Sequence, residues 1–326
     1  MKQTYIGYST DNAIRHKATS GGVGTALVKY LLDNKIVQYA LSFNYDSEHV
    51  SYVPALISSF SEYNICGSIY QEMNLISAVK NLLNSTILMS TQKGASVQVG
   101  GGKIVLFALP CQAKALRAIC EKAGLNPIII GLTCSSQQSH EATSYLLSRI
   151  GVEEKNVSYL QYRGNGWPSG IQIKTKDGKD YFIKNNDSIW MEIFHSRLFI
   201  QPRCFGCRNT LNDFADIVLA DPWLPEYVKT EKEGQTLFAT YTAIGEELVS
   251  SALQNRYIEA NEVSNELLLK SQNVTIQRKE AYNSHPTVRN WIRKIFLSNI
   301  YKRFVKNRYL FRLHCRLKCR IESRIT

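Results

Sequence analysis

The chain has 326 residues, with 39 Lys and Arg against 27 Asp and Glu, which gives a formal net charge of +12. The excess is local. Residues 288–326 hold 12 Lys and Arg and one acid, Glu322, a net of +11, whereas residues 1–287 hold 27 basic and 26 acidic residues, a net of +1. A near-neutral body excludes a nucleic-acid-binding protein whose whole fold presents a basic face.

Composition also limits the class of protein and its compartment. Apolar residues at 44% and charged residues at 20% are typical of a globular protein with a buried core. No apolar run approaches the roughly 18 to 20 residues of a membrane-spanning helix, and no signal-peptide stretch follows Met1. We therefore expect a cytoplasmic protein. Because disulfides are rare in that compartment, the eight cysteines need another explanation.

The first 150 residues alternate between strand and helix patterns. Ser20-Gly21-Gly22 opens a helical pattern, with Ser20 as the expected N-cap. The expected strands are 36–43, 50–58, 103–109 and 127–132, and the expected helices are 20–31, 73–83, 112–123 and 141–150. Repeated strand–helix units predict an α/β fold with a mixed, largely parallel sheet and covering helices.

The pattern changes after residue 150. A smaller strand-hairpin region is expected, with strands over 157–162, 171–176 and 181–183, followed by a helix over 189–199 and strands over 215–220 and 236–242. The rest, from residue 245, is expected to be mostly helical. We divide the chain into an N-terminal α/β region (1–150), a C-terminal region with a C-x-x-C loop (151–287) and a helical basic C-terminal tail (288–326).

Four cysteines stand where chemistry is expected. Cys204 and Cys207 form a C-x-x-C, whose spacing lets two thiolates reach one metal ion or cluster. Cys111 and Cys134 each follow a predicted buried strand, so they should meet at the carboxyl edge of a parallel sheet, where ligands bind in such folds. Spacing alone leaves zinc and iron–sulfur open. Cys66 and Cys120 are interpreted as small buried apolar residues.

The basic tail carries an apolar repeat. Ile292, Phe296, Ile300 and Phe304 recur at i, i+4 among Lys and Arg, which is typical of a basic amphipathic helix. Such a helix lies readily on an anionic membrane surface. Docking on the body of the protein or on an acidic partner is the alternative, and nucleic acid is less favoured.

Seven motifs occur in an order that resembles the coenzyme F420 hydrogenase/dehydrogenase beta-subunit family, from about residue 5 to residue 250. The motifs are Arg15 to Gly22 (R-H-K-A-T-S-G-G), Gly67-Ser68-Ile69-Tyr70, Leu109-Pro110-Cys111-Gln112, Gly131-Leu132-Thr133-Cys134, Tyr162 to Pro168 (Y-R-G-N-G-W-P), Cys204-x-x-Cys207, and Ala215-Asp216-Ile217 with Asp221 and Trp223. The resemblance implies a protein with FAD and a 4Fe-4S cluster that passes electrons between a hydride carrier and one-electron partners.

The resemblance also implies site residues. It implies cluster ligation by Cys111, Cys134, Cys204 and Cys207, and a flavin near Thr19, Ser20, Gly21, Gly22, Gly67, Ser68, Tyr70 and Arg163. Glycines at a helix start let a phosphate approach backbone N–H groups, and Arg15, His16 and Lys17 would add charge for a pyrophosphate. Taken by itself, T-S-G-G is also typical of a plain capped helix.

Two family motifs differ here. Ala108 stands where the family has Gly before Pro-Cys, and a Gly-Asp-x-Trp-Gly pattern is replaced by residues 220–224 (A-D-P-W-L). The sequence has no second ferredoxin-like run of cysteines, so electrons should pass through a partner or a diffusible carrier, with coenzyme F420 as one candidate.

The expected function is thus a flavin- and 4Fe-4S-dependent oxidoreductase, and cell-surface polysaccharide biosynthesis is one setting that the resemblance implies. The alternative is a non-enzymatic, zinc-stabilised binding protein whose tail holds an acidic partner or RNA.

Overall fold

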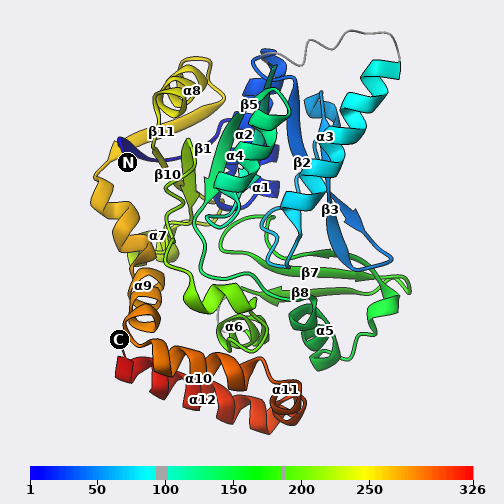
Figure 1. Cartoon of the computed structure of the whole chain (residues 1–326), viewed down its shortest axis with the longest axis vertical. Coiled ribbons are helices and arrows are strands. Elements are labelled where there is room, and N and C mark those ends of the chain that lie inside the picture. The colour runs from blue at the N-terminus through cyan, green and yellow to red at the C-terminus, as the bar shows by residue number, and fades with distance from the viewer. Residues whose placement is uncertain (93–101, 186–187, 326) are drawn as a thin grey trace.

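The structure is a computed structural model of the chain and describes residues 1–92, 102–185 and 188–325 (Figure 1). Its centre is an eight-stranded sheet in the order β11-β1-β10-β9-β5-β4-β2-β3. The strands are β1 (Gln3–Ser9), β2 (Tyr39–Asp46), β3 (Ser51–Ile57), β4 (Gly102–Ala108), β5 (Leu125–Leu132), β9 (Ile217–Ala220), β10 (Thr236–Thr240) and β11 (Ile258–Val263). Strands from both sides of residue 150 therefore share one sheet.

The parallel strands lie in the middle of this sheet. β2 pairs with β4, β4 with β5, and β5 with β9, all parallel. The centres of β4 and β5 are buried, as expected for short apolar runs with both faces covered, whereas Lys103 and Asn126 near their starts are exposed. Antiparallel strands complete the two ends. The predicted mixed α/β fold with covering helices is confirmed.

Helices cover both faces of the sheet. One face packs against α2 (Val23–Asp33) and α8 (Ala243–Gln254), and the other against α3 (Leu75–Gln92) and α4 (Ala113–Lys122). The alternation within β4 shows the two cores directly. Val105 belongs to the α2 side, whereas Ile104 and Leu106 belong to the α3 side. The result is a three-layer arrangement that leaves the carboxyl ends of β4, β5 and β9 at one edge.

Two strands were missed by the sequence analysis. β1 lies in a segment for which no element was expected, and β11 lies in a stretch expected to be mostly helical. β11 exposes half or more of its residues as an edge strand and has the sequence I-E-A-N-E-V, so neither composition nor alternation predicts a strand there. Its pairing with β1, rather than its own propensity, determines its conformation.

The predicted N-cap at Ser20 is wrong. Residues Ser20–Gly22 form a short 3₁₀ turn, and Gly22, with φ +75°, is the N-cap of α2. Ser20 itself has φ +55°. Three successive residues with positive φ turn the chain sharply before the helix, which is why the sequence signature of an ordinary capped helix does not hold here.

The strand-hairpin region is confirmed as a separate three-stranded antiparallel sheet of β6 (Val157–Gln161), β7 (Gly170–Thr175) and β8 (Asp180–Lys184). Helices α5 (His140–Arg149) and α6 (Ile189–His195) belong to the same part of the molecule. α6 is shorter than predicted because Arg197 adopts φ +66°, which ends the helix, and residue 200 instead forms an isolated bridge with Gln138. Two further short helices are α1 (Asn12–Lys17), before α2, and α7 (Pro225–Thr230), after β9.

The basic tail is folded onto the body. After α9 (Asn265–Ser284) come α10 (Pro286–Phe296), α11 (Asn299–Val305) and α12 (Arg308–Ile325). Figure 1 shows α10 and α12 side by side below α6, with α11 at the turn between them. Apolar side chains of the tail are buried in the same core as α5 and α6: Ile292, Phe296, Val305 and Phe311. Of the predicted alternatives for the tail, the structure shows docking on the body.

The predicted single apolar stripe is wrong beyond Phe296. Ser298 caps a new helix, so the residues after it no longer continue the same helical face. As a result, Ile300 is 85% exposed and Phe304 is 64% exposed. Polar contacts add to the docking: Lys302 Nζ lies 2.6 Å from a Glu141 carboxylate oxygen, and His314 Nε2 donates to the Ser196 carbonyl at 2.9 Å. Within the described residues, every helix is too short or too polar to cross a bilayer.

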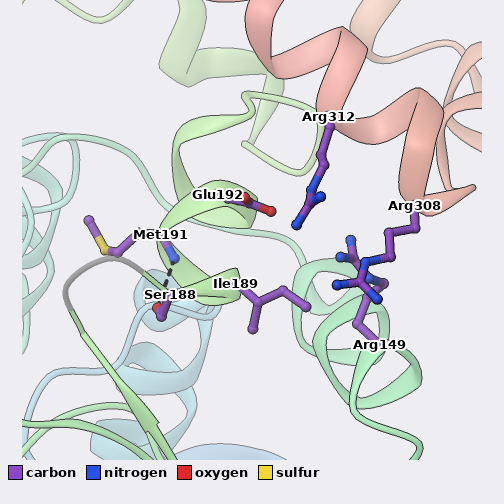
Figure 2. Close-up of a pocket in the computed structure, with 7 residues that line it drawn as sticks. All are labelled: Arg149, Ser188, Ile189, Met191, Glu192, Arg308 and Arg312. Carbon is purple, nitrogen blue, oxygen red and sulfur yellow. Dashed lines mark hydrogen bonds between the residues drawn. The ribbon is translucent and has the colours of Figure 1, made fainter.

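An open pocket of about 790 Å³ remains where α12 lies against α5 and α6 (Figure 2). Arg149 of α5 and Arg308 and Arg312 of α12 point into it, with Glu192 of α6 opposite. Arg149 also lies over the rings of Tyr145 and Phe311, so its guanidinium forms part of the contact between tail and body.

Candidate functional site

A cavity of about 800 Å³ opens at the carboxyl edge of the central strands. The ends of β4, β5 and β9 form its floor, as expected for a ligand site in an α/β sheet. Other walls come from the turn before α2, the segment 66–73, and helices α6, α9 and α12. The cavity is large enough for a dinucleotide-sized cofactor, and its lining combines aromatic, apolar and polar side chains.

The structure brings together the two segments expected to hold a flavin. The Ser68 backbone N–H donates to Thr19 Oγ1 at 2.8 Å, and the Ser68 hydroxyl lies 3.2 Å from the same oxygen. Six of the eight expected flavin residues line the cavity: Thr19, Ser20, Gly22, Gly67, Ser68 and Tyr70. Gly21 and Arg163 do not line it.

Among the described residues, three buried polar atoms on the cavity wall lack a hydrogen-bond partner: Arg197 Nε and two neutral groups. The Ser20 hydroxyl and the Trp190 indole N–H belong to residues that line the cavity, and neither has a hydrogen bond within the described residues. Buried polar groups in native proteins are nearly always hydrogen-bonded. Both atoms are therefore suited to contact a polar ligand inside the cavity.

Arg163 is buried and paired with Asp221. Arg163 is 1% exposed, and its guanidinium donates two hydrogen bonds to the Asp221 carboxylate, at 2.6 and 3.1 Å. The Trp167 indole N–H donates to the same carboxylate at 3.3 Å. Asp221 and Trp223, not Arg163, face the cavity. This ion pair fixes the position of the Asp221 side chain at the end of β9.

The expected charge for a pyrophosphate lies elsewhere. Arg15 pairs with Glu231 and Glu233, at 3.8 and 3.4 Å, and lies over the ring of Tyr8. His16 and Lys17 are exposed, and none of the three basic residues lines the cavity. Adjacency in sequence to Ser20 suggested otherwise, but α1 turns these side chains away from the site.

The four cysteines gather at the same sheet edge. β4 and β5 are adjacent and parallel, with Ala108 opposite Gly131, so Cys111 and Cys134 follow neighbouring strand ends. The loop after Cys207 lies across these ends, because Cys134 N–H donates to the Thr210 carbonyl at 3.1 Å and Asn212 Nδ2 donates to the Ala108 carbonyl at 2.8 Å.

The thiols lie close enough to affect one another. Burial raises the pKa of the Cys134 thiol to about 12; Lys279 lowers it, and Cys204, Cys111 and Cys207 raise it further. Burial likewise raises the pKa of the Cys204 thiol, and Cys111 and Cys207 raise it further. Cys134 also lines the cavity, so the thiol site and the cavity share a wall.

Lys279 is the residue at this edge that the sequence analysis missed. It is 4% exposed, and its ammonium contacts the carbonyls of Cys134 and Asn209 at 2.8 Å and the Cys207 sulfur at 3.5 Å. No carboxylate contacts it within the described residues. A buried cation without a counter-ion is costly. Lys279 and the four cysteines together therefore suit a negatively charged group bound between the thiols.

Among residues 1–92, 102–185 and 188–325, no group of three or more His, Cys, Asp or Glu side chains is arranged to hold a metal ion. A single zinc needs its ligands within about 2.3 Å of one centre. A 4Fe-4S cluster takes one thiolate per iron and so spreads four sulfurs more widely. Ligation by the four cysteines stays a prediction at this point.

The fold and the site define a class: a three-layer α/β protein with a cofactor-sized cavity beside a cysteine-rich sheet edge. The chain belongs to the coenzyme F420 hydrogenase/dehydrogenase beta-subunit family, because residues 4–80 match the family's N-terminal part and residues 101–266 match its C-terminal part. The resemblance stated from the motifs is thereby confirmed.

Two relatives share most of the chain. The F420-dependent formate dehydrogenase subunit beta of Methanocaldococcus jannaschii is 24% identical over 307 residues, which is 89% of this chain and 72% of the relative. A chain of the F420-reducing [NiFe] hydrogenase complex from Methanosarcina barkeri superimposes with a TM-score of 0.61 at 19% identity, over 85% of this chain and 89% of that chain. The second likeness concerns the fold alone.

Proposed function

We propose that this protein is an oxidoreductase that binds FAD and a 4Fe-4S cluster and passes electrons between a hydride carrier and a redox partner or substrate. The observation that carries the proposal is the shared wall. A cavity lined by the expected flavin residues and an edge bearing four thiols meet at Cys134. Family membership supports oxidoreductase chemistry, because the matched family comprises beta subunits of coenzyme F420 hydrogenase/dehydrogenase and the relative found by sequence is a subunit of an F420-dependent formate dehydrogenase.

The chain's own residues divide the work. Thr19, Ser20, Gly22 and the segment 67–70 would hold the flavin, and Asp221, fixed by Arg163, would orient it. Cys111, Cys134, Cys204 and Cys207 would hold the cluster, with Lys279 as the counter-charge. When bound, a flavin can exchange two electrons as a hydride or one electron at a time, and an iron–sulfur cluster exchanges single electrons.

The hydride carrier is proposed to be coenzyme F420 or another diffusible carrier. The name of the formate dehydrogenase relative favours F420. The differences at Ala108 and at residues 220–224 lie at the cavity edge, where Ala108 and Ala220 form part of the lining, so the carrier must be measured rather than assumed. The setting in cell-surface polysaccharide biosynthesis stays a prediction.

Iron content of cysteine variants tests the ligand assignment. We expect roughly four iron and four sulfide per chain in protein purified anaerobically. Cys134→Ser and Cys204→Ser should lose most of the iron, whereas Cys319→Ser, which changes an exposed thiol of α12, should keep it. A protein with one zinc and neither iron nor flavin would instead establish the zinc-stabilised binding protein.

The outer face of the tail supports a separate proposal about location: peripheral contact with an anionic membrane, from the cytoplasmic side. On α12, Phe311, His314 and Lys318 face the body. Tyr309, Leu313 and Leu317 repeat at i, i+4 on the opposite, exposed side, with the exposed Arg316 and Arg320 between them. An exposed surface of apolar and cationic side chains matches anionic lipid, and each basic residue adds about 1 kcal/mol near it.

Vesicle sedimentation tests this location. The full-length protein should sediment with vesicles of phosphatidylcholine and phosphatidylglycerol but not with phosphatidylcholine alone. The double variant Leu313→Asp, Leu317→Asp should bind at least about tenfold more weakly. Phe182→Asp, which places the same charge on an exposed apolar residue of β8, should leave binding unchanged. Absence of wild-type binding to the anionic vesicles would refute membrane contact and favour an acidic partner.

A further inference from the structure

The cavity has a cationic wall that none of the cofactor residues explains. Arg197 follows α6, Arg278 lies on α9, and Lys318 lies on α12 together with Glu322. All four line the cavity. They come from three separate segments of the chain, and two of them belong to the basic tail. Arg197 is 2% exposed and Lys318 6% exposed, so these charges are part of the interior.

On this wall, the Glu322 carboxylate contacts two of the three cations. Lys318 Nζ lies 2.8 Å from one oxygen of Glu322, and Arg197 Nε lies 3.5 Å from the other. Tyr282 also donates a hydrogen bond to Glu322, at 2.8 Å. Arg278 contacts only the hydroxyl and carbonyl of Ser135 in the described structure, at 3.0 and 3.2 Å. The wall therefore carries a formal charge of +2.

The hydrogen-bonding capacity of the wall is also incomplete. Arg197 Nε is buried and has no hydrogen bond of acceptable geometry within the described residues, and Arg197 NH1 reaches Ser136 Oγ only at 3.5 Å. Guanidinium groups carry five N–H donors in a planar fork that matches carboxylate and phosphate oxygens. Two arginines with unused donors and excess charge face one cavity.

The positive charges of this wall also act on a neighbouring side chain, His195. Desolvation lowers the pKa of His195; Arg197, Lys318 and Arg278 lower it further, and Glu322 opposes them. His195 also lines the cavity. Its ring is therefore neutral at physiological pH and offers a donor or an acceptor beside the cations.

The other cations at or near the cavity have polar contacts of their own. Arg163 is paired with Asp221, and Lys279 contacts the thiol edge. Lys270, at the rim, lies 3.6 Å from Glu266. The charge at Arg197, Arg278 and Lys318 is thus distinct from that of the flavin end and from that of the cysteine edge.

We propose that Arg197, Arg278 and Lys318 bind an anionic group, a carboxylate or a phosphate, of the molecule that exchanges electrons with the flavin. This inference rests on the proposed function for the identity of that molecule. A buried net positive charge is stabilised by a bound anion, and the two guanidinium groups supply directional donors for it. The substrate class is therefore an anionic compound, and the folded tail takes part in selecting it.

Direct binding of small anions tests the site without any turnover. Calorimetric titration of the purified, cofactor-containing protein with inorganic phosphate and with acetate should show binding of at least one of them. Arg278→Gln should weaken that binding by about tenfold or more, because it removes one charge-assisted contact. Arg278→Lys should restore part of it. Lys302→Gln, which breaks another ion pair between tail and body, outside the cavity, is the matched control and should bind like wild type.

The results separate this inference from the proposed function. A wild-type protein that binds neither anion refutes the anionic site, whatever its flavin and iron content. If Arg278→Gln instead loses FAD in proportion to anion binding, the wall holds the diphosphate of the flavin, and the inference is overturned. Absence of flavin and iron from a protein that still binds phosphate or acetate refutes the proposed function and leaves the anion site standing.

Kinetics then assign the anion to the substrate. With a pair of hydride donors that share a ring and differ in an anionic side chain, Arg278→Gln should raise KM for the charged donor about tenfold and leave kcat and the uncharged donor unchanged. Equal effects on both donors would contradict recognition of the charge.

Discussion

Gly67 allows two motifs of the site, the segment 67–70 and Tyr162 to Pro168, to pack in direct contact. Its φ is +67°, and a Cβ placed on it would lie 1.8 Å from the carbonyl oxygen of Arg163. The same turn presents the Ser68 N–H to Thr19. Only a residue without a side chain allows this approach, so Gly67 sets the distance between the segment 67–70 and the Tyr162 to Pro168 motif.

Alanine at Gly67 should therefore be much more destabilising than alanine at a glycine with the same backbone but free space. Gly178, in the β7–β8 turn, has φ +82° and no atom within 4 Å of an added Cβ. We expect Gly178→Ala to lower the free energy of unfolding by about 1 kcal/mol and Gly67→Ala by about 3 kcal/mol or more, since it adds a backbone clash. Urea denaturation measures both; similar losses would contradict the close approach.

His314 makes stability depend on pH. Burial lowers its pKa, Lys318 lowers it further, and the hydrogen bond to the Ser196 carbonyl opposes them. Because the unfolded value is about 6.5, the unfolded chain takes up this proton first as the pH falls. The contribution to stability is complete above about pH 6.5 and is lost as the pH falls toward the folded pKa.

His314→Gln should flatten this dependence. Between about pH 6.5 and 5, the wild type should lose up to about 1.4 kcal/mol of unfolding free energy per pH unit more than the variant. Urea unfolding at several pH values gives both slopes. Identical slopes would show that folding does not lower the pKa of His314.

Sequence reasoning predicted contiguous parts of the site and missed the dispersed ones. Thr19, Ser20 and the segment 67–70 stand in short motifs, so their joint order was visible in the chain. Lys279, Arg197 and Lys318 are isolated basic residues whose surroundings do not differ from those of a solvated helix face. Their burial depends on how α9 and α12 pack, which no local pattern encodes.

At the scale of elements, the tail shows how one capping residue changes an amphipathic pattern. The i, i+4 repeat from Ile292 to Phe304 fits one helix in sequence, but Ser298 accepts from the Tyr301 N–H and starts α11. Phe296 is therefore 2% exposed, whereas Phe304 is 64% exposed. Side chains with the same sequence signature have opposite environments.

This difference in exposure predicts that alanine substitution is strongly destabilising at Phe296 and nearly neutral at Phe304. Phe296→Ala should lower the free energy of unfolding by about 3–5 kcal/mol, because it leaves a cavity in the core shared with α5 and α6. Phe304→Ala should change it by less than about 0.5 kcal/mol. If both were neutral in thermal or urea unfolding, the tail would be detached from the body in solution.

The elements that sequence analysis predicted well are those with a strong pattern of their own. β4 and β5 each contain a continuous apolar run, 104–108 and 127–130, so their existence and their parallel arrangement followed from the chain. β1 and β11 are held in the sheet by their mutual pairing. A strand specified by its neighbour rather than by its own side chains is not visible until the fold is known.

At the scale of the whole molecule, the basic tail and the cofactor cavity are less separate than the sequence indicated. The net charge of +11 in residues 288–326 belongs to a folded layer, not to an appended segment. Lys318 and Glu322 carry part of that layer into the cavity. The outer side chains of the same helices support membrane contact, and the inner ones support recognition of an anionic substrate.

The central claim is that flavin and cluster occupy adjoining sites and exchange electrons. Its most direct measurement is the visible spectrum of protein purified anaerobically, before and after addition of a reduced hydride carrier such as F420 or a nicotinamide. The account predicts a brown protein with flavin bands and a broad band near ~400 nm, both of which bleach together when the carrier is added. A colourless protein that contains one zinc and no flavin would contradict it.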